Sequence, residues 1–339
     1  MRKEVILVTG AAGEMGQALI ERLCEDGVNN ILALDVKAPP EDIQRRCAVW
    51  IVGDILDEKL INRLIAEFAI PKIFHLAALL STRAEFTPEA AHQVNVNGTL
   101  SLLRVAAEQS TWLGYPVKFM FPSSVAVYGL PDLETKARAG AVKENEWNVP
   151  ATMYGCNKLY AEHLGRYYAR HYRQLAAEEQ HHSVDFRSIR FPGLISAFTV
   201  PAGGTSDYGP EMLHHAAQNK PYACFVRPDT TMPFMAMPDA IKALCDLEAA
   251  PAERLTSHVY NITSFSLSAQ EIEEQVRRAF PNAVITYEPH LKRQRIVDSW
   301  PMDQDDSLAR ADWGWRPDYD LRRAFDEYLV PNIARRYAG

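Results

Sequence analysis

The stretch LVTGAAGEMGQAL, residues 7–19, decides the fold of this 339-residue chain. It places Gly10, Gly13 and Gly16 between an apolar run and a helical pattern, the context in which glycines form a phosphate-binding turn. The first glycine permits the tight turn, the second lets backbone amides approach a pyrophosphate, and the third lets helix and strand pack closely. The helix N-terminus offers free N–H groups and a positive dipole end. We therefore expect a dinucleotide at this turn.

A carboxylate follows the glycine turn. Asp35 ends the next apolar run, NILALDV (30–36), nineteen residues after Gly16. There it would accept hydrogen bonds from both ribose hydroxyls of NAD and repel the 2′-phosphate of NADP. Two unit charges at about 4 Å cost roughly 1 kcal/mol in water and about 4 at an effective dielectric of 20. Because only Lys37 is nearby as a counter-charge, the sequence favours NAD, unless Asp35 is simply a strand-end residue at a turn.

Further residues near the glycine turn are expected to line the cofactor. Asp54 ends the third apolar run, where a carboxylate would reach the adenine amino group; a helix N-cap is the alternative. The small residues Ala77 and Ala78 would let the cofactor lie close to a strand end, although strand packing explains them almost as well. The other expected cofactor contacts are Glu14, Met15, Ile55 and Leu76.

Apolar runs alternate with helical patterns over the first 193 residues. The strands are expected at 4–10, 30–36, 46–54, 72–78, 117–124 and 184–192, and the helices at 13–26, 57–68, 88–109 and 154–179. This alternation predicts an α/β fold with a doubly wound parallel sheet of the Rossmann type. We expect an NAD-binding domain over 1–193 and a smaller C-terminal substrate lobe over 194–339. The position of this boundary is approximate, and strands after residue 193 could belong to the main sheet.

Composition is that of a soluble globular protein, with 47% hydrophobic and 23% charged residues. The net charge of −7 argues against nucleic-acid binding through a general positive field. The sequence contains no run of about 18 apolar residues, so no membrane-spanning helix is predicted. The start MRKEVILVTGAAG (1–13) is only superficially like a signal peptide, since its short apolar part leads into the glycine turn. A cytoplasmic protein is expected.

The cysteines are odd in number and widely scattered, without a C-x-x-C pair, so reduced thiols are expected. No ligand pattern for zinc or another metal is found, and no metal is expected. The five cysteines are Cys24, Cys47, Cys156, Cys224 and Cys245.

The last helix of the first domain is expected to carry a general base. Tyr154 and Lys158 in YGCNK (154–158) are four positions apart and share a helix face. A neighbouring ammonium favours the phenolate, so Lys158 should lower the pKa of Tyr154 from near 10. Ser123 and Ser124, at the carboxyl end of the fifth strand, offer a hydroxyl to the reacting oxygen. Each of these features alone usually has no catalytic role, such as a surface tyrosine or a turn serine. Their joint order along the chain indicates an oxidoreductase site.

Several motifs together resemble the extended short-chain dehydrogenase/reductase family. They are TGAAGEMG (9–16), NVNGT (95–99), SSVAVYG (123–129) and YGCNK (154–158). The second half is similar to the NAD-dependent L-threonine 3-dehydrogenases of that fold. The segments that carry this narrower resemblance are VDFRSIRFPGLIS (184–196), GGTSDY (203–208), PDTTMPFMAMPDA (228–240) and DSWPMDQDDSLARADWGW (298–315).

The resemblance implies a reaction and a role for each catalytic residue. Tyr154 would take the proton from the C3 hydroxyl of L-threonine, Lys158 would lower its pKa and hold the nicotinamide ribose, and Ser124 would hydrogen-bond the reacting oxygen. Hydride would pass from C3 to NAD, giving 2-amino-3-oxobutyrate and NADH. Ser81, Thr205 and Trp300 would surround the amino acid together with Ser124 and Tyr154.

The resemblance also implies supporting features. Asn95 would have a structural role near the site, and the helices expected at 88–109 and 154–179 would pair two copies of the chain in a four-helix bundle. We therefore expect a homodimer that acts on a small amino-acid substrate. Apparent insertions near 133–145 and 174–183 put loop positions in doubt; the first is polar and is expected at the surface.

Two different functions are also compatible with these motifs. A nucleotide-sugar epimerase or dehydratase uses the same Tyr–Lys pair, although HLKRQR (290–295) is the one obvious basic cluster for a second pyrophosphate. An NAD-sensing regulator would have no need of the base. The alternative to a substrate-binding role is exposure to solvent for Thr205 and a packing role for Trp300. The sequence does not distinguish threonine from allo-threonine or other 3-hydroxy amino acids, nor does it show which loop closes over the site.

A pair of arginines near the expected site is also ambiguous. Arg187 and Arg190 alternate along the expected strand 184–192, where such residues usually form a solvated or ion-paired face. No cation for the substrate carboxylate is assigned from the sequence.

Overall fold

The computed structural model describes residues 2–176, 184–201 and 204–338. They form two compact units, each assembled from three separate segments. The first unit consists of Met1–Ser123, Cys156–Ile189 and Ile241–Val259, and the second of Ser124–Gly155, Arg190–Ala240 and Tyr260–Gly339. The division at residue 193 stays a prediction, because compactness alone does not show which segments fold independently.

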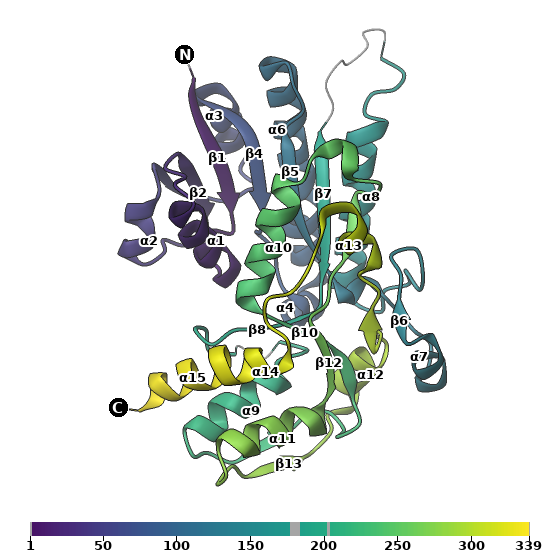
Figure 1. The fold of residues 1–339 in the computed structure, drawn as a ribbon. Helices are drawn as coiled ribbons and strands as arrows, with labels where there is room; N and C mark the ends of the chain where they lie inside the picture. Colours follow the sequence, from purple (N-terminus) through teal and green to yellow (C-terminus); the bar gives the residue numbers. More distant parts are fainter. Residues whose placement is uncertain (1, 177–183, 202–203, 339) are drawn as a thin grey trace. The chain divides into compact units, whose positions relative to one another are not determined.

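A seven-stranded sheet forms the centre of the first unit, in the order β11-β7-β5-β4-β1-β2-β3 (Figure 1). β1 pairs in parallel with both β2 and β4, so the chain order reverses there. Its strands are β1 (Lys3–Thr9), β2 (Ile31–Asp35), β3 (Val49–Val52), β4 (Phe68–His75), β5 (Lys118–Ser124), β7 (Asp185–Phe191) and β11 (Val259–Asn261). The predicted doubly wound α/β fold is confirmed, and β11 brings a strand from beyond residue 193 into the main sheet.

Helices cover both faces of this sheet. Residues of α3 (Glu58–Glu67), α6 (Gly98–Leu113) and α8 (Met153–Arg170) share one apolar core with alternate strand residues such as Val5 and Leu7. On the other face lie α1 (Glu14–Glu25) and α10 (Met237–Ala249), where Arg22 of α1 is close enough to Asp246 of α10 for their charges to interact. Burial on both faces explains why the strands are almost continuously apolar.

Two predicted helices differ from the structure. The helix expected at 88–109 consists of α5 (Pro88–His92), a π-helical turn η1 (Gln93–Asn97) and α6. The helix expected at 154–179 ends at Arg170, and residue 179 lies outside the described residues. The chain leaves the helix through a turn in which Arg173 has a left-handed φ of 53°. Apolar and polar residues continue past this point, so the sequence pattern alone does not show the end.

The second unit contains smaller sheets and short helices. Its strands are β6 (Ala141–Val142), β8 (Gly193–Ile195), β9 (Tyr222–Cys224), β10 (Thr231–Ala236), β12 (Phe265–Ser268), β13 (Ile285–Tyr287) and β14 (Asp303–Gln304). Its main helices are α7 (Leu133–Ala139), α9 (Tyr208–Ala217), α11 (Ala269–Ala279), α12 (Leu291–Asp298), α13 (Ser307–Trp313), α14 (Leu321–Arg323) and α15 (Val330–Tyr337). Two short helices, α2 (Glu41–Arg46) and α4 (Ser81–Phe86), belong to the first unit.

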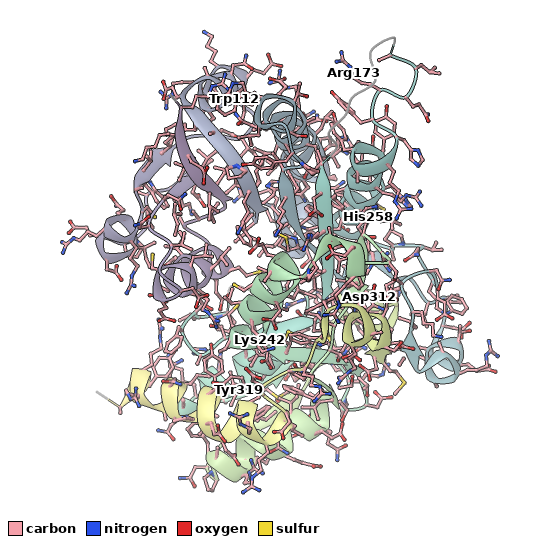
Figure 2. All side chains as sticks on the ribbon, turned by 45° about the horizontal axis from the view of Figure 1, so that its top comes forward. Trp112, Arg173, Lys242, His258, Asp312 and Tyr319 are labelled. Carbon is pink, nitrogen blue, oxygen red and sulfur yellow. The ribbon has the colours of Figure 1, made fainter. Side chains whose placement is uncertain are left out.

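Buried polar contacts organise the second unit. Tyr260 donates a hydrogen bond of 2.8 Å to Asp312 of α13, and Asp239 accepts hydrogen bonds from the backbone N–H groups of Asp318 and Tyr319. Asp312 and Tyr319 are labelled in Figure 2. Burial raises the pKa of Asp239, and the two backbone donors oppose that effect. No helix within the described ranges is long and apolar enough to cross a bilayer.

The apparent insertion near 133–145 contains the helix α7 (Leu133–Ala139). The prediction that this segment lies at the surface is correct for only part of the helix, because Thr135 and Lys136 are buried. The following β6 pairs with β14, so this segment is built into the second unit.

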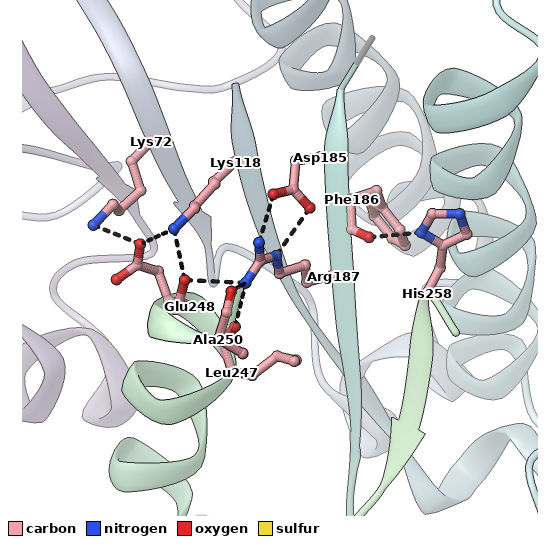
Figure 3. A network of polar contacts seen from close by, with 9 residues as sticks. All are labelled: Lys72, Lys118, Asp185, Phe186, Arg187, Leu247, Glu248, Ala250 and His258. Atoms are coloured by element: carbon pink, nitrogen blue, oxygen red, sulfur yellow. Dashed lines mark hydrogen bonds and ion pairs between the residues drawn. The ribbon is translucent and has the colours of Figure 1, made fainter. Parts of the chain in front are cut away.

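The C-terminal end of α10 is held to the sheet by an ion network (Figure 3). The carboxylate of Glu248 lies 2.7 Å from Lys72 Nζ on β4 and 3.0 Å from Lys118 Nζ on β5. Burial raises the pKa of Glu248, but the hydrogen bonds and charges of the two lysines outweigh it and hold that pKa below its usual value.

Candidate active site

The glycine turn has the geometry that the sequence predicted. Gly10 adopts a left-handed φ of 68°, and a Cβ added there would lie 2.5 Å from the backbone nitrogen of Ala77. A Cβ at Gly16 would collide with the backbone of Gly10 and Ala11. Gly13 is the N-cap of α1 and supplies no side-chain cap, so the first N–H groups of the helix are available to an anion. The turn therefore fits a pyrophosphate.

Asp35 lies beside this turn. Its Oδ2 accepts a hydrogen bond from Ala12 N at 3.0 Å, and its Oδ1 accepts one from Lys37 N at 3.0 Å. The carboxylate is thus fixed at the carboxyl end of β2, next to the glycines, and retains acceptor capacity on both oxygens. This arrangement fits a ribose, and it places a negative charge where a 2′-phosphate would come.

The other expected cofactor residues surround the turn in different ways. Asp54 is not a helix N-cap, since it accepts a hydrogen bond from Leu56 N while Asp57 caps α3. Ala77 N approaches Thr9 Oγ1 at 3.4 Å, which brings the end of β4 against β1. The remaining positions are Glu14 and Met15 in the first turn of α1, the buried Ile55, and the half-buried Leu76 and Ala78.

The structure separates the roles of the two neighbouring serines. Ser123 is buried and donates a hydrogen bond to Glu162, whereas Ser124 is half-buried and hydrogen-bonds Tyr154. Ser124 also caps the short helix η2 (Val125–Val127) by accepting a hydrogen bond from Ala126 N at 3.2 Å. Of the pair, Ser124 is the one brought to the phenol.

The pKa of Tyr154 is shifted against the expected direction. Burial raises it to about 12, and the hydrogen bond with Ser124 opposes this. The expected lowering of this pKa by Lys158 is therefore wrong, because burial of the phenol dominates and Ser124 is the group that opposes it. The sequence showed the helical spacing of the two residues but not the depth at which the phenol lies.

Lys158 is buried on α8, four positions after Tyr154. Its Nζ donates a hydrogen bond of 2.6 Å to the carbonyl oxygen of Pro122 and lies 4.5 Å from the ring centroid of Phe121. Burial lowers the pKa of Lys158 to about 7, and the charge of Glu162 acts in the opposite direction. Near neutral pH this amine is thus able to gain or lose a proton.

Asn95 supports the loop after β4, in keeping with the structural role that the resemblance implied. Its Oδ1 accepts a hydrogen bond from Leu79 N at 2.8 Å, and its Nδ2 donates to Leu79 O at 3.0 Å. The same Nδ2 lies 3.4 Å from Asn157 Oδ1 on α8. The π-helical turn η1 presents Asn95 for these contacts, and Asn157 is a site neighbour that the sequence motifs did not single out.

The expected substrate residues lie in different parts of the chain. Ser81 begins α4 in the first unit, and Thr205 and Trp300 are buried in the second. The loop at Thr205 is anchored by Asp207, whose Oδ2 accepts from Gly204 N at 2.6 Å, and by Arg293, which donates to Gly204 O. Ser124 and Tyr154 are brought together; the substrate roles of the other three stay predictions.

Arg187 is ion-paired and buried rather than solvated (Figure 3). Its guanidinium donates to the carbonyl oxygens of Leu247, Glu248 and Ala250 at 2.6, 3.1 and 2.7 Å, and to the carboxylate of Asp185. It thereby satisfies carbonyls at the C-terminal end of α10, where a cation is favourable. Its role is structural.

Arg190 makes a similar internal contact in the second unit. It donates to Glu144 O at 2.9 Å, and its guanidinium lies 4.9 Å from the ring centroid of Tyr128. None of the five cysteines forms a disulfide, and no group of three metal-ligating side chains occurs in residues 2–176, 184–201 and 204–338.

Several known proteins similar to this chain are L-threonine dehydrogenases. The mitochondrial L-threonine 3-dehydrogenase of Bos taurus is 35% identical over 317 residues, covering 93% of this chain and 79% of the bovine one. A monomeric L-threonine 3-dehydrogenase from a metagenome is 36% identical, with a TM-score of 0.86 over 98% of this chain and 100% of that structure. The L-threonine dehydrogenase of Clostridium difficile is 32% identical, with a TM-score of 0.87 over the whole of both chains.

A more distant structure, a UDP-glucose 4-epimerase from Thermotoga maritima, is 19% identical with a TM-score of 0.81 over 98% of this chain and 99% of that one. At that identity the likeness concerns the fold alone. The family model that matches residues 6–263 describes the NAD dependent epimerase/dehydratase family. With its glycine turn, strand-end carboxylate and Ser–Tyr–Lys set, the chain belongs to the NAD dependent epimerase/dehydratase family.

Proposed function

We propose that this chain is an NAD-dependent L-threonine 3-dehydrogenase. It would oxidise the C3 hydroxyl of L-threonine to 2-amino-3-oxobutyrate and form NADH. The hydrogen bond between Ser124 and Tyr154 carries the proposal, because it joins a hydroxyl at the end of β5 to the phenol at the start of α8. Support for the substrate comes from relatives named as threonine dehydrogenases at 32–36% identity over almost the whole chain.

Three side chains have distinct tasks in this reaction. The phenol of Tyr154 is the group that removes the hydroxyl proton, while the C3 hydrogen departs with its electron pair. Ser124 donates a hydrogen bond to the reacting oxygen and steadies it as a carbonyl forms. Lys158 contributes a positive charge that favours the phenolate and donates hydrogen bonds to the ribose.

NAD, when bound, would supply the hydride acceptor and a positive charge that favours the phenolate form of Tyr154. Gly10, Gly13 and Gly16 would hold its pyrophosphate, and Asp35 would bind the adenosine ribose and exclude NADP. Asp54, Ile55, Leu76, Ala77, Ala78, Glu14 and Met15 would complete the cofactor contacts. Ser81, Thr205 and Trp300 would hold the amino acid.

The epimerase alternative is not better supported. It shares the Tyr–Lys pair, but the epimerase structure shares 19% of residues with this chain, against 36% for the metagenomic threonine dehydrogenase. The two activities differ in their net redox change, since an epimerase returns the hydride to its substrate within one catalytic cycle.

Absorbance at 340 nm therefore tests the proposal. Purified protein is incubated with NAD and, separately, with L-threonine, L-allo-threonine, L-serine and UDP-glucose. Net NADH formation with L-threonine is expected, and it should be faster than with the other compounds. Absence of NADH with every amino acid, together with conversion of the nucleotide sugar, would refute the dehydrogenase assignment.

We expect two copies to pair through α6 and α8, which carry the exposed apolar residues Leu100, Trp112, Tyr160 and Tyr167 (Trp112 is labelled in Figure 2). A stable four-helix interface buries apolar surface of this kind. One similar structure is described as monomeric. The molecular mass of this chain in solution, measured by light scattering, tests whether it forms a dimer. A cytoplasmic location likewise stays a prediction, and the bovine relative is described as mitochondrial.

A further inference from the structure

Glu162 is a buried carboxylate to which the proposed mechanism assigns no task. It lies on α8, and its side chain accepts a hydrogen bond from Ser123 Oγ at 2.5 Å. Both residues are 3% exposed. Burying a carboxylate is costly unless it is hydrogen-bonded or paired with a cation, so its retention at this depth calls for a partner.

Lys158 is the cation next to Glu162. The two residues are four positions apart on α8 and therefore share a helix face. The carboxyl end of β5 contacts both of them: Pro122 O accepts from Lys158 Nζ at 2.6 Å, and Ser123 Oγ donates to Glu162. The strand thus fixes an amine and a carboxylate one helical turn apart, in a region shielded from water.

Two other titratable groups near Lys158 in space or along α8 are uncharged at neutral pH: His75, whose pKa is lowered by burial and further by the charge of Lys158, and Tyr154. His75, at the end of β4, shares hydrogen bonds with Thr9 and Thr99, and burial lowers its pKa to about 3. The pKa of Tyr154, one turn earlier on α8, is about 12. Burial lowers the pKa of Lys158 to about 7, and Glu162 is the group that acts against this.

We propose that Glu162 is a positioning residue that favours the ammonium form of Lys158, with Ser123 fixing the carboxylate. The consequence for catalysis rests on the proposed function. The ammonium form is the one that favours the phenolate of Tyr154 and holds all three N–H donors for Pro122 O and the ribose. Without the carboxylate, burial alone would set the protonation of Lys158 and would favour the neutral amine.

The titration of Lys158 tests this inference without turnover. Lysine labelled with ¹³C at the ε-carbon is incorporated into the full chain, and the Lys158 NMR signal is identified by its loss in Lys158→Met. The midpoint of its titration is then compared in wild type and Glu162→Gln, which keeps the side-chain shape and an acceptor for Ser123. The midpoint should fall by about one pH unit or more in Glu162→Gln; an unchanged midpoint would overturn the inference.

Two further variants separate local charge from general effects. Glu108→Gln removes an exposed carboxylate from α6 in the same unit and should leave the Lys158 midpoint unchanged. Glu162→Asp keeps a carboxylate but sets it back by one methylene, so its midpoint should lie between those of wild type and Glu162→Gln. If Glu162→Gln does not fold, Glu162→Asp decides, and a midpoint at or above the wild-type value contradicts the inference.

Activity is measured separately. If wild type forms no NADH from threonine, the proposed function fails, while the NMR titration still decides the role of Glu162. If NADH forms, the alkaline decline of kcat should begin at a lower pH in Glu162→Gln than in wild type. A parallel loss at every pH, without a shift of the profile, would indicate a merely structural role.

Discussion

Lys136 Nζ donates a hydrogen bond of 3.1 Å to the carbonyl oxygen of Val297, 161 positions further along the chain. Lys136 is 4% exposed and lies on α7, while Val297 is in the last turn of α12. A cation at a helix C-terminus satisfies a carbonyl that has no partner within the helix. Leu130 N also donates to Ser299 O at 2.8 Å, so the segment before Trp300 is held from two points.

The pH dependence of stability should reveal the burial of Lys136. Burial lowers its pKa to about 8 from 10.5; Asp298 opposes the shift, Arg227 adds to it and Asp229 opposes it. Between these values the unfolded chain binds the proton and the folded protein does not, so wild-type stability rises with pH there. Relative to Lys136→Met, wild type should gain up to about 1.4 kcal/mol per pH unit between pH 8 and 10. Urea unfolding at pH 7, 8, 9 and 10 measures the difference, and a flat profile would contradict a buried amine.

Removal of the Tyr154 hydroxyl should abolish the chemistry and spare cofactor binding. Tyr154→Phe removes the group that takes the proton, and loss of a general base costs about 10²- to 10⁴-fold in kcat. The glycine turn and Asp35 are untouched, so NAD affinity measured by NADH fluorescence displacement should stay within a factor of about two. Comparable turnover in wild type and variant would exclude Tyr154 as the base.

The conformation of the glycine turn and the position of Asp35 beside it were predictable, because their spacing along a strand–turn–helix–strand pattern is visible in the sequence. The residue pattern alone left Ser123 and Ser124 open, since both end β5, and it was the family resemblance that assigned Ser124. The structure shows the physical difference, because Ser123 is engaged by Glu162 of α8 while Ser124 hydrogen-bonds Tyr154. The rise in the pKa of Tyr154 is likewise a consequence of depth, and depth is set by tertiary packing. A lysine in a polar stretch is normally exposed, which is why Lys136 was expected at the surface.

The charge of Asp35 should decide between NAD and NADP. Asp35→Asn keeps an acceptor for Ala12 N but removes the charge that repels a 2′-phosphate. A repulsion of about 1 to 4 kcal/mol corresponds to a roughly 5- to 1000-fold rise in the ratio of kcat/KM for NADP to that for NAD. Asp35→Ala should raise the ratio similarly while also freeing Ala12 N. If neither variant changes the ratio, Asp35 does not select the cofactor.

A methyl group at Gly10 should damage both stability and NAD binding. Gly10→Ala combines a left-handed φ of 68° with a Cβ only 2.5 Å from Ala77 N. The backbone conformation costs about 1–2 kcal/mol and overpacking about 1–3 kcal/mol more. Gly27→Ala is a matched control, because Gly27 also has a left-handed φ, 85°, but nothing lies within 4 Å of its Cβ position. In urea unfolding, Gly10→Ala should lose clearly more stability than Gly27→Ala, and only Gly10→Ala should weaken NAD binding. Equal losses would mean that the close approach of Leu76 and Ala77, just after β4, does not constrain this position.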